Sequence, residues 1–126
     1  MDDEQFHREQ ILQFQRCAGR LEAAAEAEDG APLIPLAEAF AELASRPAAL
    51  HDEGPGLVSR LFTVAPGYAQ GFPRDLLWYL GAECLHYMPD EEIETFNELD
   101  EDRRDAASRG LRFDWSGAVA STRTLQ

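Results

Sequence analysis

Apolar side chains recur every three or four residues along much of the chain, which is the period of an α-helix with one buried face. The first stripe consists of Ile11, Phe14, Ala18, Leu21 and Ala25. Asp2 or Asp3 stands where such a helix needs an N-terminal cap. We therefore predict a helix that starts at these acids and ends by Gly30, a residue type that often follows a helix.

Three weaker patterns follow before the middle of the chain. Leu36, Phe40 and Leu43 form a second helical stripe that should end near Pro47. The segment 51–56 contains two glycines and a proline, so we predict a loop there. The run 57–64 has some features of a strand, but a lone strand would have no pairing partner, and we predict a helix.

The stretch 72–110 is the centre of the sequence, because its first half is the most apolar run and its second half the most acidic. Pro73 suits the first position of a helix, and Pro89 ends that helix and allows the next to begin. We predict a buried helix over 73–88 and an amphipathic helix over 90–109. Gly81 weakens the first of them, and we expect it to allow close contact with another helix.

These elements predict an all-α protein, an irregular bundle of four to five helices around the central pair 73–88 and 90–109. A chain of 126 residues is long enough to bury a core as one domain, which we place at 1–110. Residues 111–126 form a C-terminal tail. Its first part is a candidate for docking on the domain, whereas its last ten residues are expected to be flexible.

The charge balance excludes several classes of function. There are 24 acidic and 11 basic residues, and all of the bases are arginine. Without lysine the chain has no Schiff-base lysine and no phosphate-loop lysine. A net charge of −13 disfavours direct binding to nucleic acid or to anionic membranes, and it is compatible with a basic protein partner or with simple solubility.

Composition also bears on location. The acidic N-terminus does not resemble a signal peptide, and no apolar run approaches the roughly 20 residues of a membrane span. Abundant Ala and Arg with no Lys suggest a GC-rich bacterial genome. Cys17 and Cys84 lie in apolar helical contexts, and we expect both to be small buried groups in a reducing cytoplasm.

The strongest candidate for metal chemistry is a pair of Glu-x-x-His steps, one at Glu4 and His7 and the other at Glu83 and His86. Ferritin-like di-iron sites use two such steps and two further glutamates. The further glutamates could come from Glu38 or Glu42 and from Glu92 or Glu94. One step lies at a helix end and the helices are short, so we expect no metal site and no cofactor.

Cys84 and His86 are also too poorly placed for nucleophilic catalysis, because residues two apart on a helix do not face each other. Paired carboxylates for hydrolysis would need a cleft, whereas the acids of 90–109 mostly fall on a solvated helix face. We therefore predict no catalytic residues.

Aromatic residues give a clearer indication of binding. Trp78, Tyr79, Phe113 and Trp115 lie in or just after the central helix pair. Such residues are enriched where proteins meet, so we predict that these four bind a partner. Alternatively, Phe113 and Trp115 fold back and cover the helix over 73–88 within one chain. A homodimer would be compatible with both interpretations.

Taken together, the sequence favours a small acidic cytoplasmic bacterial protein that is not an enzyme. We expect it to bind another protein as a regulator of the adaptor or anti-activator type, with the acids of 90–105 attracting a basic partner. One alternative is an immunity protein that neutralises a toxin. A second is a metal-dependent, ferritin-like enzyme.

Overall fold

The computed structural model describes residues 1–125, with side chains through residue 122, and every regular element in this range is helical. The α-helices are α1 (Asp3–Ala25), α2 (Ile34–Ala44), α3 (Leu50–Val64), α4 (Tyr68–Gly71), α5 (Arg74–Leu80), α6 (Asp90–Ser108) and α7 (Trp115–Leu125). The 3₁₀ segments are Ala31–Leu33, Pro47–Ala49 and Ala82–Tyr87. The all-α prediction is confirmed, with more helices than expected.

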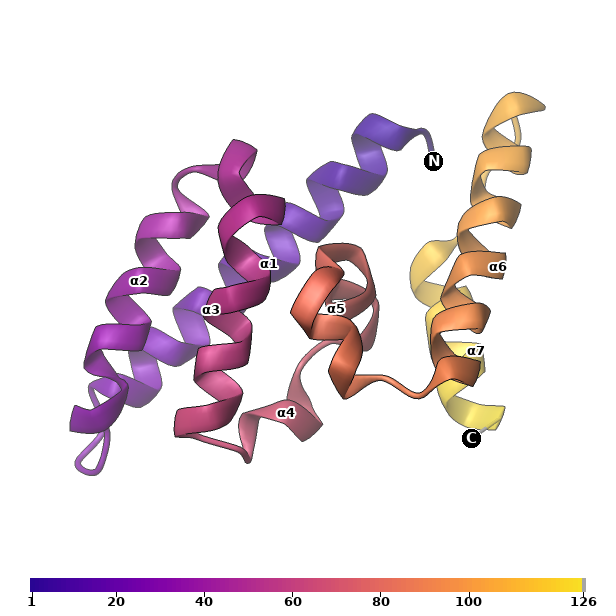
Figure 1. Ribbon diagram of the computed structural model, residues 1–126. Coiled ribbons are helices and arrows are strands. Elements are labelled where there is room, and N and C mark those ends of the chain that lie inside the picture. The colour runs from indigo at the N-terminus through magenta and orange to yellow at the C-terminus, as the bar shows by residue number, and fades with distance from the viewer. Residues whose placement is uncertain (126) are drawn as a thin grey trace.

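Two groups of helices flank the short helix α5 (Figure 1). α2 and α3 pack side by side with α1 at one end of the molecule, and α6 and α7 pack together at the other. α1 is the longest helix, and its N-terminal half reaches towards α5 and α6 (Figure 1). α1 therefore links the two ends of the fold.

The predicted stripe of α1 forms its buried face, with Phe14 and Leu21 almost fully enclosed. Phe14 stacks on Phe40 of α2 with ring centroids 5.2 Å apart. Burying an aromatic ring of this size contributes about 1.5–3 kcal/mol. At the N-terminus, Asp2 accepts a hydrogen bond from the Gln5 backbone while the Gln5 side chain accepts one from the Asp2 backbone, a capping box that fixes the helix start.

The segment 51–56 is not a loop, because α3 runs continuously from Leu50 to Val64 and includes Pro55. This also confirms the helix predicted over 57–64. The composition of the segment reflects packing. Gly54 is buried, and a Cβ atom there would lie 3.1 Å from the Leu80 side chain of α5. Glycine thus lets α3 and α5 approach each other.

The buried helix predicted over 73–88 is interrupted. α5 ends at Leu80, and residues 82–87 form a 3₁₀ segment. Gly81 makes the break, with φ 68° and ψ −151°, a backbone conformation that is essentially restricted to glycine. A Cβ atom on Gly81 would meet nothing closer than the Trp78 carbonyl oxygen at 3.9 Å. Gly81 is therefore needed for the backbone turn and not, as predicted, for contact with another helix.

Most of the C-terminal tail is helical. Residues Trp115–Leu125 form α7, Gln126 lies outside the described residues, and the flexibility of the last ten residues stays a prediction. Asp114 starts the helix by accepting a hydrogen bond from the Gly117 backbone. Trp115 is 2% exposed and holds α7 on the domain. Among the described residues, no helix combines the length and the apolar character needed to cross a membrane.

Candidate functional site

A buried carboxylate, that of Asp75, joins three helices. Its Oδ2 atom accepts hydrogen bonds from Gln10 Nε2 at 3.1 Å, Gln13 Nε2 at 2.8 Å and Trp115 Nε1 at 3.0 Å. Gln10 and Gln13 lie on α1 and Trp115 begins α7, whereas Asp75 is in the first turn of α5, where the helix dipole favours an acid. This network fixes the C-terminal helix against the rest of the fold.

The sequence analysis did not identify Asp75 as a site residue. The available signal was Gln10 and Gln13, two amides one turn apart beside the apolar stripe of α1. Gln10 is 1% exposed, and a buried amide requires a polar partner. The partner could not be assigned, because Asp75 and Trp115 lie about 60 and 100 residues further along the chain.

A cleft of about 790 Å³ opens beside Asp75, between α1, the turn before α5 and α7. It adjoins an apolar pocket of about 420 Å³ that is lined by α1, α2, α3 and the segment around α4. Arg20, Gly71 and Pro73 line both spaces. Cys17 lines the apolar pocket, and burial raises the pKa of its thiol. Both volumes are typical of small-molecule sites.

The four residues predicted to bind a partner lie in one region but differ in exposure. Trp115 is buried, with its ring centroid 4.7 Å from that of Phe6, so it covers the interior as the alternative interpretation proposed. Trp78, Tyr79 and Phe113 are half-buried. They surround Trp115 and Phe6, with ring centroids 5.7–6.4 Å apart in the closest pairs. Partner binding by these residues stays a prediction.

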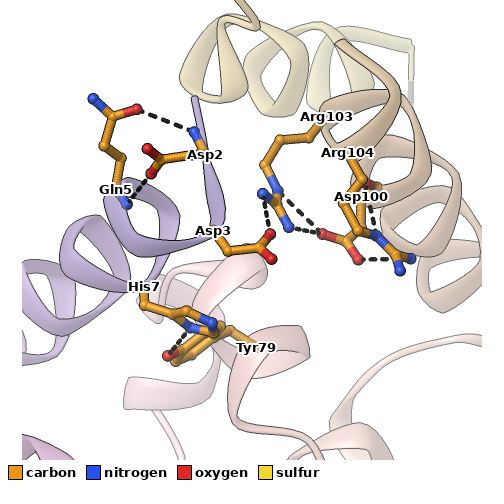
Figure 2. Close-up of polar contacts among 8 residues, drawn as sticks. All are labelled: Asp2, Asp3, Gln5, His7, Tyr79, Asp100, Arg103 and Arg104. Carbon is orange, nitrogen blue, oxygen red and sulfur yellow. Dashed lines mark hydrogen bonds and ion pairs between the residues drawn. The ribbon is translucent and has the colours of Figure 1, made fainter. Parts of the chain in front are cut away.

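Tyr79 connects two histidines that are distant in sequence. Its hydroxyl lies 2.7 Å from His7 Nδ1, and its backbone carbonyl lies 3.0 Å from His51 Nε2 (Figure 2 shows the His7 contact). Burial raises the pKa of the Tyr79 hydroxyl. The pair ties α5 to both α1 and α3.

Arg103 fixes α6 to the start of α1. Figure 2 shows its guanidinium between Asp3 and Asp100, at 2.9 and 2.8 Å. The guanidinium carbon also lies 4.3 Å from the Phe6 ring centroid, a cation–π contact. Arg103 is 4% exposed, and its hydrogen bond and charge lower the pKa of the Asp3 carboxyl.

The nine acids of α6 differ in how they are paired. Those that face the fold are paired: Glu92 with Arg74 at 2.6 Å, and Asp100 with Arg103 and Arg104. On the outer side Asp105 pairs with Arg109 at 3.4 Å, whereas six other exposed acids have no ion pair within the part of the chain that the structure describes. This group, called here the acidic face, comprises Asp90, Glu91, Glu94, Glu98, Glu101 and Asp102.

Trp78 lies at the base of the acidic face. Its Nε1 donates to Asn97 Oδ1 at 2.9 Å, and its ring stacks on Phe96 with centroids 6.1 Å apart. Asn97 is exposed and lies between Glu94, Glu98 and Glu101 on the helix surface. The half-buried indole is thus hydrogen-bonded to a residue whose neighbours on the helix surface are acids of the acidic face.

The comparison with protein families gives one match: the family model described as PA2817-like aligns with residues 5–125. The chain belongs to the PA2817-like family. No curated protein and no solved structure matches it. The aligned region runs from α1 through α7, so it includes both the Asp75 network and the acidic face.

The residues weighed for chemistry are dispersed in this PA2817-like chain. Glu83 and His86 are exposed on the 3₁₀ segment, while His7 contacts Tyr79. Within residues 1–125, no group of three or more His, Cys, Asp and Glu side chains is placed to hold a metal ion. Cys84 is 0% exposed, and burial, with a smaller effect of the Glu83 charge, raises the pKa of its thiol to about 12. It packs as a small protonated apolar group.

Proposed function

We propose that this protein acts without catalysis, as a regulator that binds a basic segment of another protein through the acidic face of α6. The proposal depends mainly on the distribution of ion pairs on that helix. Acids that face the fold each have an arginine, and so does the outer Asp105, whereas the six acids of the acidic face have none among the described residues. Repulsion along this face destabilises the free helix, and a cationic partner would relieve it.

Two further features support a protein partner. Trp78 is half-buried beside the face, and an indole next to carboxylates suits a lysine or arginine side chain by cation–π and ionic contact. In addition, α6 stands at one end of the molecule with its outer side away from the other helices (Figure 1). Tyr79 and Phe113 extend the aromatic region, and Trp115 supports it from inside.

The same charge distribution favours a basic partner over a second copy of the chain. A two-fold contact between α6 helices would bring carboxylates against carboxylates. A homodimer would therefore have to use another surface. We place the protein in the bacterial cytoplasm as part of the proposal. An immunity protein that covers a basic toxin would use the same face, and only the partner's identity separates the two roles.

The test compares two variants with the same change in net charge. One carries Glu94→Gln, Glu98→Gln and Glu101→Gln on the acidic face. The matched control carries Glu22→Gln, Glu26→Gln and Glu28→Gln at the far end of α1, where the side chains are exposed and unpaired among the described residues. Each variant is used to capture partners from the host and then to measure affinity for those recovered.

We expect the face variant to bind the wild-type partner about tenfold more weakly, because exposed ion pairs contribute about 0.2–1 kcal/mol each. The control variant should bind like wild type, and 1 M salt, where charges are screened within about 3 Å, should weaken wild-type binding. Equal binding by the two variants, or binding insensitive to salt, would show that the acidic face is not the docking surface.

A further inference from the structure

A second binding feature lies on the other side of α5, in the cleft beside Asp75. Asp75 is 7% exposed, and its Oδ2 atom receives all three of its hydrogen bonds. The Oδ1 atom receives none from the described residues, and among these residues no fully buried side-chain oxygen lacks a partner, so Oδ1 is not fully buried. Oδ1 is therefore open to the cleft that Asp75 lines. A nearly buried carboxylate thus presents one free acceptor to a ligand-sized space.

Two arginines provide the opposite charge in the same cleft. Arg16 and Arg20 project from consecutive turns of α1 into its lining. Neither has a carboxylate partner within the described part of the chain, where Arg20 Nη2 lies 3.5 Å from Cys17 Sγ. Among the other arginines of the described part, Arg60 and Arg112 likewise lack an ion pair, whereas Arg46, Arg74 and Arg103 pair with carboxylates.

The apolar pocket adjoins this charged cleft at Arg20. Leu21, Phe40, Leu61 and Phe72 line it. A side chain that enters it from the cleft would leave water for an apolar environment, while groups attached to that side chain would remain beside the arginines and Asp75. Its volume of about 420 Å³ is sufficient for a large aliphatic or aromatic side chain.

We propose that the joined cleft and pocket bind a free α-amino acid with a large apolar side chain. The ammonium group donates to Asp75 Oδ1, the carboxylate contacts Arg16 and Arg20, and the side chain occupies the apolar pocket. Each of the three parts of the ligand thereby meets a matching part of the site. This inference is separate from the docking of a protein on α6, and either can fail without the other.

The experiment titrates the full chain with L-phenylalanine, L-leucine and L-methionine, and follows binding by saturation-transfer NMR and by thermal shift. Two analogues of phenylalanine each remove one charge: phenethylamine lacks the carboxylate, and hydrocinnamate lacks the ammonium. Glycine keeps both charges and lacks the side chain. We expect at least one of the three amino acids to bind at millimolar concentration or below. Phenethylamine and hydrocinnamate should bind at least about tenfold more weakly than phenylalanine, and glycine at least about tenfold more weakly than the amino acid that binds.

Three variants locate the site. Arg16→Gln combined with Arg20→Gln removes the cations from an exposed helix surface and should abolish binding. Asp75→Asn keeps an acceptor for the three N–H donors and turns an NH₂ group towards the cleft, so it should fold and lose binding. Arg60→Gln, which removes an exposed arginine of α3 without an ion pair among the described residues, should bind like wild type.

The proposal is wrong if none of the three amino acids binds at millimolar concentration. It is also wrong if the double arginine variant binds as well as wild type, because the ligand would then lie elsewhere. Binding of hydrocinnamate as tight as that of phenylalanine would overturn the role of Asp75, and the site would be one for simple apolar acids.

Discussion

The Asp75 network makes a quantitative prediction about stability. Substituting Asp75→Ala removes the acceptor of three N–H donors at once. Gln10 and Trp115 are 1% and 2% exposed, so water cannot readily replace the lost oxygen at either donor. Gln13 is half-buried and lines the cleft, so its amide can be rehydrated. The loss in the free energy of unfolding therefore comes mainly from the buried donors of Gln10 and Trp115.

A buried donor without a partner costs about 1–3 kcal/mol, and the donor at the cleft adds about 1 kcal/mol or less. Because cleft water can reach part of the network, we expect a loss of about 3–4 kcal/mol in the free energy of unfolding. Domains of this size have about 5–15 kcal/mol in total, so the variant should still fold. The melting temperature should fall by roughly 10–15 °C.

The assay is urea unfolding followed by tryptophan fluorescence, which reports on Trp78 and Trp115. The matched control is Asp75→Asn, in which the amide oxygen can still accept hydrogen bonds from Gln10, Gln13 and Trp115. This variant should lose only about 1 kcal/mol in the free energy of unfolding. The reasoning is refuted if Asp75→Ala costs less than about 1 kcal/mol, or if the asparagine variant is as unstable as the alanine variant.

Three other predictions follow from local geometry. Gly81→Ala should lower the free energy of unfolding by about 1–3 kcal/mol, because alanine does not readily adopt the positive φ of this position. Gly19→Ala, in α1 with open space around it, should raise the free energy of unfolding by up to about 1 kcal/mol. Chemical unfolding will show whether the two changes have opposite signs. At pH 8 N-ethylmaleimide should modify half-buried Cys17 well before Cys84, as mass spectrometry will show, and equal rates would contradict the burial. Arg46 pairs with Glu42 and Glu53 and lowers the pKa of both carboxyls, so their contribution to stability is present above pH 4.5 and is lost as the pH falls through the lowered pKa values. Arg46→Gln should raise both pKa values in an NMR titration, and unchanged values would contradict the bridge.

The helical fold could be predicted because its information is local. The stripe of α1, the cap at Asp2 and the restart at Pro89 each depend on residues within a few positions. The errors came from glycine and proline, whose meaning depends on the surroundings. At 51–56 they allow α3 to pack against α5, and at Gly81 a single glycine ends a helix that the apolar pattern would have continued.

The candidate site was predicted only in part, for the opposite reason. Trp78 and α6 are close in sequence, and the structure joins them through the hydrogen bond from Trp78 to Asn97. The burial of Arg103 depends on Asp3, 100 residues away, and the Asp75 network joins three separate helices. Such contacts are set by tertiary packing, so Gln10 and Gln13 signal a buried polar group in the sequence, but their partners and the cleft beside them have no sequence pattern.

The central claim is that the acidic face of α6 is a docking surface for a basic protein segment, and site-directed photo-crosslinking in the host tests it most directly. A photoreactive side chain is placed at Glu98 on the face or, as the control, at Glu26 beyond α1; both positions are exposed. We expect a specific adduct from position 98 whose cross-linked peptide is rich in Lys or Arg; it should be absent at position 26 and, in a host lysate, lost in high salt. No adduct from position 98, or the same adducts from both positions, would contradict it.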